Sequence, residues 1–578
     1  MRPRFLFLHP ADGVGAGIGE AGGALHDLLP VERRVGAATL FTSPGCPVIP
    51  LPAIEGCLIG SLFSANGSTA LEGLSPAEQL TIMSTNGHAL ISQGSGAYVA
   101  MWRGCGDGPI NVVRDPSACL PAFLVQGDGL LAIASDIECL TAANVAKLDI
   151  DPGGVAQHLR FPLVPNTATC LDGIEELRPG FRYELADRLN VDCLWHPRTF
   201  AASPSLDIDR IAAAIDAVAT GQSIDGARCA IELSGGLDSS ILAAAFAKAT
   251  TPVALHMVPA AADGDERRYA HIVADHFNMP MHETPIGFED VDPLAPAYRL
   301  TARPTGVLHF RPIDRKFRRA QAETGADLVF SGTGGDSVFG TLSSTAPVID
   351  AWLDGGVRLA RSTLADIARI RGVTRWEATR SLLRRLLVHR RRGWTWPADD
   401  SLLGPIGRAA VAPDGSLLDG LRPGARAYCA SLLRMRALLD AHDRVVDGDI
   451  RFPLMAQPVL EACLAVPSWR WMTGGRDRAA AREAFAGRVP QEILQRRGKG
   501  RYDTLIVRAY EASKPGLREL LLDGWLARRG LIERDAVERA LSTQTNNIEA
   551  TYSRVIMLAD TESWCRMILG RKRETGPR

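Results

Sequence analysis

The chain has 578 residues, of which 46% are hydrophobic and 22% are charged, a balance typical of globular proteins with sizeable cores. Because this length exceeds what one ordinary core holds, we expect two domains and an added helical region. The formal net charge of −1 gives no indication of a nucleic-acid partner, which a large excess of Lys and Arg would suggest.

Cysteine usage and hydropathy indicate the compartment. Eleven cysteines stand singly, without a C-x-x-C pair, which argues against a zinc site or a redox dithiol. The apolar patch at residues 5–8 is shorter than the roughly 7 residues of a signal peptide. No stretch approaches the ~18 uncharged apolar residues of a membrane helix. We therefore expect a cytoplasmic protein with neither a membrane nor a nucleic acid as partner.

The first 200 residues are rich in glycine, proline and short β-type runs. Such runs lie at residues 97–102, 110–113 and 130–134, and turn residues separate them. This pattern is typical of short strands in a layered sheet structure. We predict a β-rich domain over residues 1–200.

The pattern changes beyond residue 200. An amphipathic stretch at 208–219 leads into an apolar run at 230–233, a glycine pair and an alanine-rich helix at 239–250. Strand and helix signals recur at 253–258 and 266–277, and another glycine loop follows a run at 326–330. This alternation predicts a parallel sheet with helices on its faces, in a domain over 201–570 that is mostly helical after residue 350. Residues 571–578 are predicted to be a frayed tail.

The loop 234–240, S-G-G-L-D-S-S, carries the clearest chemical signal. Two glycines after a strand let backbone N–H groups and the next helix N-terminus converge on one anion. The loop is not a Walker loop, because it lacks G-x-x-x-x-G-K-[ST]. Asp238 would repel a phosphate unless a divalent cation lay between them, so we predict a magnesium ion.

A second acidic side chain, Asp336, follows a similar glycine loop at 330–337. Both loops follow strands of one predicted sheet, so Asp238 and Asp336 can meet at its carboxyl edge. Either loop alone fits a glycine turn with a helix-capping Asp or Ser. The two together favour a nucleotide and metal site.

At this point the sequence resembles a known family. The loop S-G-G-L-D-S-S is similar to the S-G-G-x-D-S signature of ATP pyrophosphatases, and segments 265–283 and 325–336 resemble the synthetase domain of asparagine synthetase. Segments 112–123, 133–140 and 173–185 resemble its amidotransferase half, and the resemblance covers roughly residues 50–510. It implies a mixed fold, α/β in its synthetase part and α+β overall. A degenerate class II glutamine-amidotransferase-like (Ntn) domain would precede an adenine nucleotide alpha-hydrolase-like (PP-loop) domain, with ATP and Mg²⁺ as cofactors.

The resemblance also implies roles for individual residues. Asp238 and Asp336 would hold the metal. Lys499, between two glycines, stands where relatives carry a catalytic lysine, although a solvated basic turn is the other interpretation. Asp449 matches the acidic position of an E-x-R-x-P motif and could deprotonate the attacking amine. The implied ATP- and pyrophosphate-binding residues are Leu233, Ser234, Gly235, Gly236, Asp238, Ser239, Met257, Gly332, Gly334 and Gly335.

One departure from the family narrows the function. Glutamine-dependent members have a cysteine directly after the initiator methionine, and this chain has Arg2 there. Without that thiolate, nothing obvious takes ammonia from glutamine. Cys57 is internal, and a buried core residue is the better interpretation for it. We therefore expect an amine already present on the substrate.

Two kinds of relatives lack the glutaminase: the β-lactam synthetases and the lasso-peptide macrolactam cyclases. Segment 451–469, and Ser337 in place of the usual Glu, resemble the cyclases. The implied reaction adenylates an Asp or Glu side chain of a ribosomal precursor peptide, and the N-terminal amine of the same peptide then closes an isopeptide bond. Pyrophosphate and AMP leave. A leader peptidase and a leader-binding protein are further partners that the resemblance implies.

Other interpretations remain open. A β-lactam-synthetase-like or asparagine-synthetase-like ligase would act on a small amino-acid substrate, and a non-catalytic scaffold would only bind peptide. A tRNA-modifying protein with this loop is disfavoured, because the chain has neither a C-x-x-C pair nor excess positive charge. The basic run 384–393 fits either a peptide or partner contact or a solvated helix face. His256 fits either an adenine neighbour or a satisfied core histidine.

Overall fold

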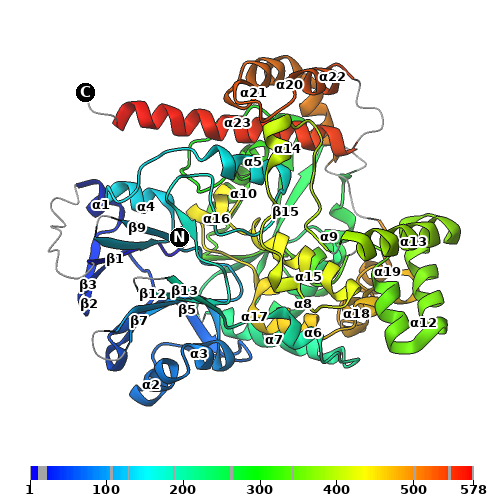
Figure 1. The fold of residues 1–578 in the computed structure, drawn as a ribbon. Coiled ribbons are helices and arrows are strands. Elements are labelled where there is room, and N and C mark those ends of the chain that lie inside the picture. The colour runs from blue at the N-terminus through cyan, green and yellow to red at the C-terminus, as the bar shows by residue number, and fades with distance from the viewer. Residues whose placement is uncertain are drawn as a thin grey trace.

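The computed structural model describes residues 2–10, 23–104, 108–127, 129–186, 189–224, 226–260, 264–341, 344–392, 394–498, 503–543 and 549–575. Two antiparallel sheets form the N-terminal part, and a parallel sheet surrounded by helices forms the C-terminal part (Figure 1). The mixed α/β fold expected from the sequence is thereby confirmed, with its antiparallel N-terminal and parallel C-terminal halves.

The N-terminal sheets pack face to face. The first has the strand order β11-β9-β10-β1-β3-β2, and the second has the order β13-β12-β8-β7-β5-β4, with β6 beside β5. Phe7 and Ile133 of the first sheet and Ile59 and Val99 of the second lie in one buried cluster, so alternate side chains of both sheets fill the layer between them. The strands are β1 Phe5–Pro10, β2 Val31–Val35, β3 Ala38–Thr42, β4 Val48–Leu51, β5 Gly56–Ser64, β6 Ala70–Leu71, β7 Gly94–Arg103, β8 Ile110–Arg114, β9 Phe123–Gly127, β10 Leu130–Ala134, β11 Glu175–Glu176, β12 Phe181–Leu185 and β13 Leu189–Cys193.

The parallel sheet has the order β16-β15-β14-β17-β18. The chain proceeds from β14 to β15 and β16 on one side and returns to β17 and β18 on the other. The order therefore reverses between β14 and β17, and in open parallel sheets such a point opens a crevice at the carboxyl ends of the strands. The strands are β14 Cys229–Glu232, β15 Val253–Pro259, β16 Met281–Ile286, β17 Leu328–Phe330 and β18 Ile450–Arg451.

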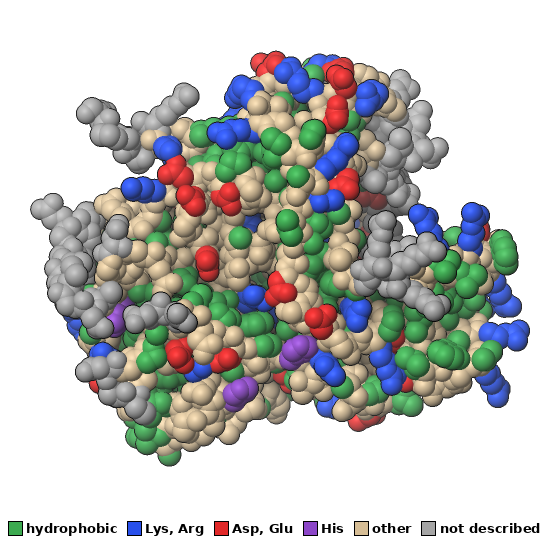
Figure 2. Space-filling view, viewed as in Figure 1, with side chains coloured by type: hydrophobic (Ala, Val, Ile, Leu, Met, Phe, Trp, Pro, Cys, Tyr) green, Lys and Arg blue, Asp and Glu red, His purple; other side chains and the backbone are tan. Residues whose placement is uncertain are grey.

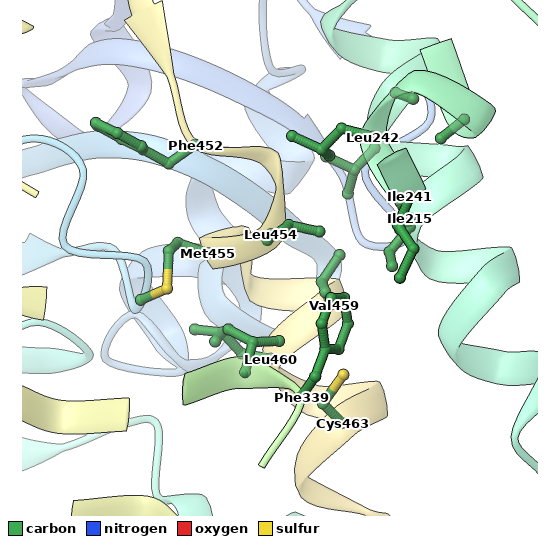
Figure 3. Close-up of a cluster of buried hydrophobic side chains, with 14 of the residues drawn as sticks. Ile215, Ile241, Leu242, Phe339, Phe452, Leu454, Met455, Val459, Leu460 and Cys463 are labelled. Carbon is green, nitrogen blue, oxygen red and sulfur yellow. The ribbon is translucent and has the colours of Figure 1, made fainter. Parts of the chain in front are cut away.

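Helices cover both faces of this sheet. A buried apolar cluster joins Ile215 of α7 and Leu242 of α8 to Phe339, Leu454 and Val459 (Figure 3). Because α8 begins within the first glycine loop, the packing of α8 in this cluster holds that loop in place. The helices up to residue 350 are α1 Gly23–Leu28, α2 Pro76–Ser84, α3 His88–Gln93, α4 Ile137–Ala142, α5 Pro152–Arg160, α6 Pro197–Ala201, α7 Asp209–Gln222, α8 Leu237–Phe246, α9 Arg267–His276, α10 Arg311–Thr324 and α11 Gly335–Val338.

The remainder of the chain is mostly helical, as predicted. Helices α12 and α13 project together at one edge of the molecule, and α20 to α23 pack on one another at the top of the view (Figure 1). The remaining α-helices are α12 Pro347–Arg371, α13 Arg375–Arg392, α14 Pro405–Ala409, α15 Pro423–Arg436, α16 Asp443–Asp447, α17 Gln457–Leu464, α18 Ala479–Ala484, α19 Gln491–Gln495, α20 Asp503–Leu522, α21 Trp525–Arg528, α22 Arg534–Ser542 and α23 Glu549–Thr575. None of these described helices is long and apolar enough to cross a membrane.

The strands predicted at 97–102, 110–113 and 130–134 are β7, β8 and β10. Tyr98 and Trp102 share a buried cluster with Ile215 of the following part, so the packing does not separate two domains at residue 200. The domain boundary at this residue stays a prediction. Helix α23 runs further than predicted, through residues 571–575 of the expected tail. Residues 576–578 lie outside the described residues.

Candidate active site

A cavity of about 620 Å³ opens at the carboxyl ends of the central strands. Its walls come from segments far apart in the chain: the loops after β14 and β17, strand β15, helix α10, residues 435–444 and residues 477–498. The polar side chains that line it include Glu232, Ser234, Asp238, Ser239, His256, Asp314, Ser331, Thr333, Asp336, His442, Arg444, Asp477, Arg478, Arg482, Arg496 and Arg497.

The two glycine loops touch one another inside this cavity. A Cβ atom on Gly335 would lie 2.5 Å from Cγ of Asp238, and one on Gly332 would lie 3.1 Å from the backbone nitrogen of Ser239. A side chain at Gly335 would therefore push the loops apart. Gly335 is therefore needed for the close approach of the loops, and Gly332 leaves little room for a side chain, which is the use of glycine that the sequence indicated.

The first loop presents donors to the cavity. Ser239 Oγ accepts a hydrogen bond from the backbone N–H of Ser234 (3.3 Å), and the hydroxyls of the two serines lie 3.3 Å apart. Helix α8 begins at Leu237, so its free N–H groups and the positive end of its dipole lie beside these hydroxyls. This arrangement can bind phosphate oxygens.

Asp238 and Asp336 converge on a single cation. The Nη1 atom of Arg478 donates to both carboxylate oxygens of Asp238 (3.1 Å each) and to Oδ1 of Asp336 (2.8 Å). Burial alone would lower the pKa of Arg478, but Asp238, Asp477 and Asp336 together raise it above its ordinary value. The two carboxylates thus offer oxygen ligands around one position that already holds positive charge. That geometry and donor set fit Mg²⁺ completed by phosphate oxygens.

Arg478 itself is held in an unusual conformation. Its backbone lies in the left-handed region at φ 55°, directly before α18. Such a conformation is costly for a residue with a side chain, and it often marks a functional site. Sequence reasoning missed Arg478: a glycine pair at 474–475 precedes the run R-D-R at 476–478, but no apolar strand run and no family signature accompanies it.

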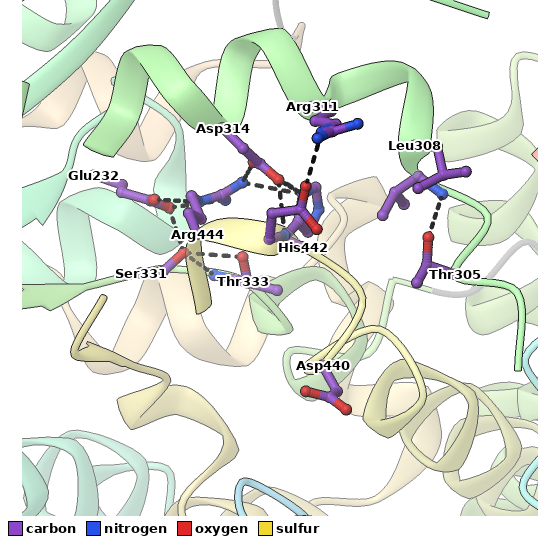
Figure 4. A network of polar contacts seen from close by, with 12 residues as sticks. Glu232, Thr305, Leu308, Arg311, Asp314, Ser331, Thr333, Asp440, His442 and Arg444 are labelled. Atoms are coloured by element: carbon purple, nitrogen blue, oxygen red, sulfur yellow. Dashed lines mark hydrogen bonds and ion pairs between the residues drawn. The ribbon is translucent and has the colours of Figure 1, made fainter. Parts of the chain in front are cut away.

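The wall of the cavity also carries a buried ionic network (Figure 4). Arg444 lies between Glu232 and Asp314: its Nε donates to Glu232 (2.9 Å) and its Nη1 donates to Asp314. The other oxygen of Glu232 accepts from the Ser331 hydroxyl (2.6 Å), which ties the end of β14 to the start of the second glycine loop. Burial raises the pKa of Asp314, but His442 and Arg444 outweigh it and hold the pKa below its usual value.

His442 belongs to the same network and lines the cavity, as Glu232, Asp314 and Arg444 also do. Its Nδ1 lies 3.2 Å from Oδ1 of Asp314, and the imidazole lines the cavity. A histidine oriented by a carboxylate can accept a proton from a nucleophile. Sequence reasoning did not predict this network, because its members come from β14, α10, the loop after β17 and residues 442–444.

Most of the predicted nucleotide-binding residues line the cavity, namely Leu233, Ser234, Gly236, Asp238, Ser239, Met257, Gly332 and Gly334, together with Asp336. Gly235 and Gly335 lie in the same loops but not on the wall. At Gly235, with φ +71°, a Cβ would lie 2.6 Å from the backbone nitrogen of Ala270 in α9. His256 is buried and lines the cavity, with Nδ1 2.7 Å from the carbonyl oxygen of Leu233, and its place beside the adenine stays a prediction.

The two predicted catalytic residues are placed differently. Asp449 does not line the cavity: Ile450 pairs with Val329, so Asp449 lies at the opposite end of β18, 3.4 Å from Arg451. Lys499 lies outside the described residues, although residues 496–498 directly before it line the cavity. The roles of Asp449 and Lys499 stay predictions.

Two residues of the N-terminal part bear on the expected absence of a glutaminase. Arg2 forms an ion pair with Asp440 beside α16. Cys57 is 1% exposed in the core between the two sheets, and burial raises the pKa of its thiol to about 12. Cys57 is therefore a protonated core residue, as expected.

Comparison with known proteins identifies the family of the chain. The profile of the family described as asparagine synthase matches residues 211–566, well over half of the sequence. The chain belongs to the asparagine synthase family. Membership makes it an ATP-dependent carbon–nitrogen ligase, and the loops at Asp238 and Asp336 lie inside the matched region.

Two further comparisons add less to this family assignment. A search of curated proteins gives no match. Among solved structures the chain is similar to the allosteric regulatory enzyme of purine biosynthesis, at 10% identity over 57% of this chain and 89% of that one. The TM-score of 0.21 is too low to bear on the fold.

Proposed function

We propose that this member of the family is a macrolactam synthetase. It adenylates an Asp or Glu side chain of a ribosomal precursor peptide and joins it to the N-terminal amine of that peptide, as in lasso-peptide biosynthesis. Pyrophosphate and AMP are released. The observation that carries the adenylation step is the convergence of Asp238 and Asp336 on one cation beside the first glycine loop.

Different residues of the cavity have different roles in adenylation. Ser234, Ser239 and the N-terminus of α8 bind the phosphate oxygens, and Leu233 and Met257 form the apolar wall for the adenine. A bound Mg²⁺, held by Asp238 and Asp336, would neutralise charge on the departing pyrophosphate. Arg478 then pairs with phosphate oxygens in place of the aspartates, so its positive charge stays within the site.

The second step requires an amine that has lost a proton. His442, oriented by Asp314, lines the cavity and accepts that proton. Ammonia from glutamine is not the donor in this proposal, because Cys57 is buried and its thiol is protonated. The amine is then part of the acyl substrate itself, which favours a ring-closing reaction.

The alternative of a small amino-acid substrate, as in β-lactam or asparagine synthetases, is supported by the size of the cavity. A volume of about 620 Å³ lies in the range typical of small-molecule sites. ATP and a small acyl group fit within it, whereas a peptide would extend beyond its walls. The substrate assay below separates the two.

A leader-binding protein and a leader peptidase belong to the same proposal. Helices α12 and α13 offer a surface for the leader-binding protein: Trp376 is 73% exposed, Leu387 is 60% exposed, and Arg380 and Arg384 lie exposed between them. Figure 2 shows hydrophobic and basic side chains gathered at this edge of the molecule. Exposed apolar groups rimmed by arginines fit an acidic amphipathic partner.

The assay uses the full chain with ATP, Mg²⁺ and a leaderless peptide encoded in a neighbouring reading frame. Mass spectrometry should show loss of one water from the peptide, and AMP and pyrophosphate should form in equal amounts. Formation of ADP would contradict adenylation. Formation of AMP only with a small amino-acid substrate would favour the alternative.

A further inference from the structure

A second cavity, of about 210 Å³, lies between the N-terminal sheets and the C-terminal part. Phe123 and Phe181 of the sheets and Trp396 of the other side give it an aromatic and largely apolar wall. It shares no lining residue with the cavity of the glycine loops. The reaction proposed above assigns no role to it.

Arg436, the last residue of α15, lines this cavity, and no carboxylate of the described residues forms an ion pair with it. The residue is only 9% exposed, and its guanidinium forms no hydrogen bond or ion pair with any residue that the structure describes. Its side-chain contact is with Trp195, whose ring centroid lies 4.9 Å from its Cζ atom. Burial lowers the pKa of Arg436 to about 10, so it remains charged at neutral pH.

The other arginines on this wall have partners. Arg114 donates to Glu176 (2.8 Å), Arg303 also pairs with Glu176, and Arg178 pairs with Asp414 (2.9 Å). Of the arginines that line this cavity, Arg436 is therefore the one without a carboxylate partner. A buried guanidinium without a partner is costly, and an anionic ligand would remove that cost.

The acidic groups near Arg436 are already engaged. Asp440 pairs with Arg2. Asp115 attracts Arg436 electrostatically, but its oxygens accept hydrogen bonds from Ser117 and from the backbone of Tyr98. No carboxylate of the described residues lies within ion-pair distance of Arg436, so the position beside it is open to a ligand.

His158 adds a neutral polar group to the same wall. Burial and the nearby Arg303 and Arg554 lower its pKa to about 3, so the imidazole is neutral at physiological pH. Its ring takes part in no hydrogen bond with the described residues. A neutral imidazole can donate one hydrogen bond to a carboxylate.

We propose that this interdomain cavity binds a carboxylate with an aromatic or large apolar body, with Arg436 pairing with the carboxylate and His158 donating a further hydrogen bond. The carboxylate belongs either to a free organic acid or to the C-terminus of a peptide. The same chemistry recognises both, and the experiment separates them. The proposal stands apart from the reaction at the glycine loops and does not depend on ATP.

The position of the cavity would allow a bound ligand to influence the active site through the chain segment between them. Leu433, Arg436 and Asp440 line the interdomain cavity, whereas Met435 and His442 line the cavity of the glycine loops. One chain segment, residues 433–442, therefore separates the two. A carboxylate bound at Arg436 would fix the end of α15 and with it the placement of His442.

The test measures binding to the full chain without ATP by isothermal titration calorimetry. The probes are 3-phenylpropionate and the tripeptide Ala-Ala-Phe, each beside its carboxamide. At least one carboxylate should bind saturably, with its carboxamide at least about tenfold weaker. Binding of the free acid alone or of the peptide alone identifies the source. Absence of saturable binding by both carboxylates, or equal binding of acid and amide, overturns the proposal.

Variants locate the site. Arg436→Met should weaken carboxylate binding at least about tenfold, because it removes the charge but keeps an apolar chain of similar length. Arg434→Met, on the same helix but off the cavity wall, is the matched control and should bind within about twofold of the unmodified chain. Ala437→Phe keeps Arg436 and fills the cavity, so it should abolish binding even if Arg436→Met fails to fold. Unchanged binding in a folded Arg436→Met or in Ala437→Phe would contradict the assignment.

Discussion

Asp238 and Asp336 accept hydrogen bonds from the same nitrogen atom of Arg478, although they follow different strands of the parallel sheet. The relation depends on the reversal of strand order between β14 and β17, which brings both glycine loops to one crevice. The three side chains carry two negative charges and one positive charge. This local net charge changes when a metal ion or a phosphate binds in the site.

Asp336→Asn removes one of the two carboxylates with little change in shape. We expect ATP-dependent AMP formation to fall by about 10²–10³-fold, because the transition-state charge on pyrophosphate loses its metal-mediated stabilisation. The measurement is AMP release with the peptide substrate. Asp535→Asn, an exposed aspartate on α22, is the control and should retain full activity. Full activity in Asp336→Asn would argue against the metal assignment.

Arg478→Met leaves Asp238 and Asp336 facing each other without their cation. We expect the free energy of unfolding to fall by about 1–3 kcal/mol in the absence of divalent ions, because a partly buried charge loses its partner. Added Mg²⁺ should restore most of that loss and should stabilise the variant more than the unmodified chain. Thermal unfolding with and without Mg²⁺ measures both effects. If the unfolding temperature of the variant were the same with and without Mg²⁺, the carboxylates would not form a cation site.

Asp314→Asn breaks the buried pair with Arg444, and we expect a loss of about 3–5 kcal/mol in the free energy of unfolding at pH 7. The folded pKa of Asp314 is depressed, so its contribution is complete above its unfolded pKa of about 3.9 and is lost as the pH falls through the folded value. The difference between the variant and the unmodified chain should therefore narrow below about pH 4. Urea unfolding across pH 3–7 tests this, and a difference that stayed constant would contradict the role of the ion pair.

His442→Gln tests the second step separately from the first. We expect ring closure to slow by about 10²–10⁴-fold, because the proton of the amine loses its acceptor. Exchange of labelled pyrophosphate into ATP, which reports adenylation, should remain within about threefold, since the side chain of His442 contacts Asp314 and Arg444 and not the phosphate loop. Equal losses in both assays would mean that His442 serves nucleotide binding or folding instead of proton transfer.

Local signals made the nucleotide loop predictable. The glycine pair after an apolar run fixed the positions of Ser234 and Asp238, and the second loop fixed Asp336, because tight turns and helix starts depend on neighbouring residues alone. The alternation of strands and helices predicted the parallel sheet for the same reason.

Long-range contacts were not predictable in this way. Arg478 reaches the aspartates from a left-handed residue in a segment without a motif, and Arg444 meets Glu232 and Asp314 only after three parts of the chain have folded together. Motif matching selected Asp449, but the parallel register of β18 places it away from the cavity, which residue spacing alone does not reveal.

The most direct test of the central claim is a crystal structure with a non-hydrolysable ATP analogue and Mn²⁺, whose anomalous signal locates the ion. We predict one ion within about 2–2.4 Å of carboxylate oxygens of both Asp238 and Asp336, with Arg478 displaced onto the phosphates. An ion bound to the phosphates without either aspartate, or Arg478 still bridging the two carboxylates, would contradict the account.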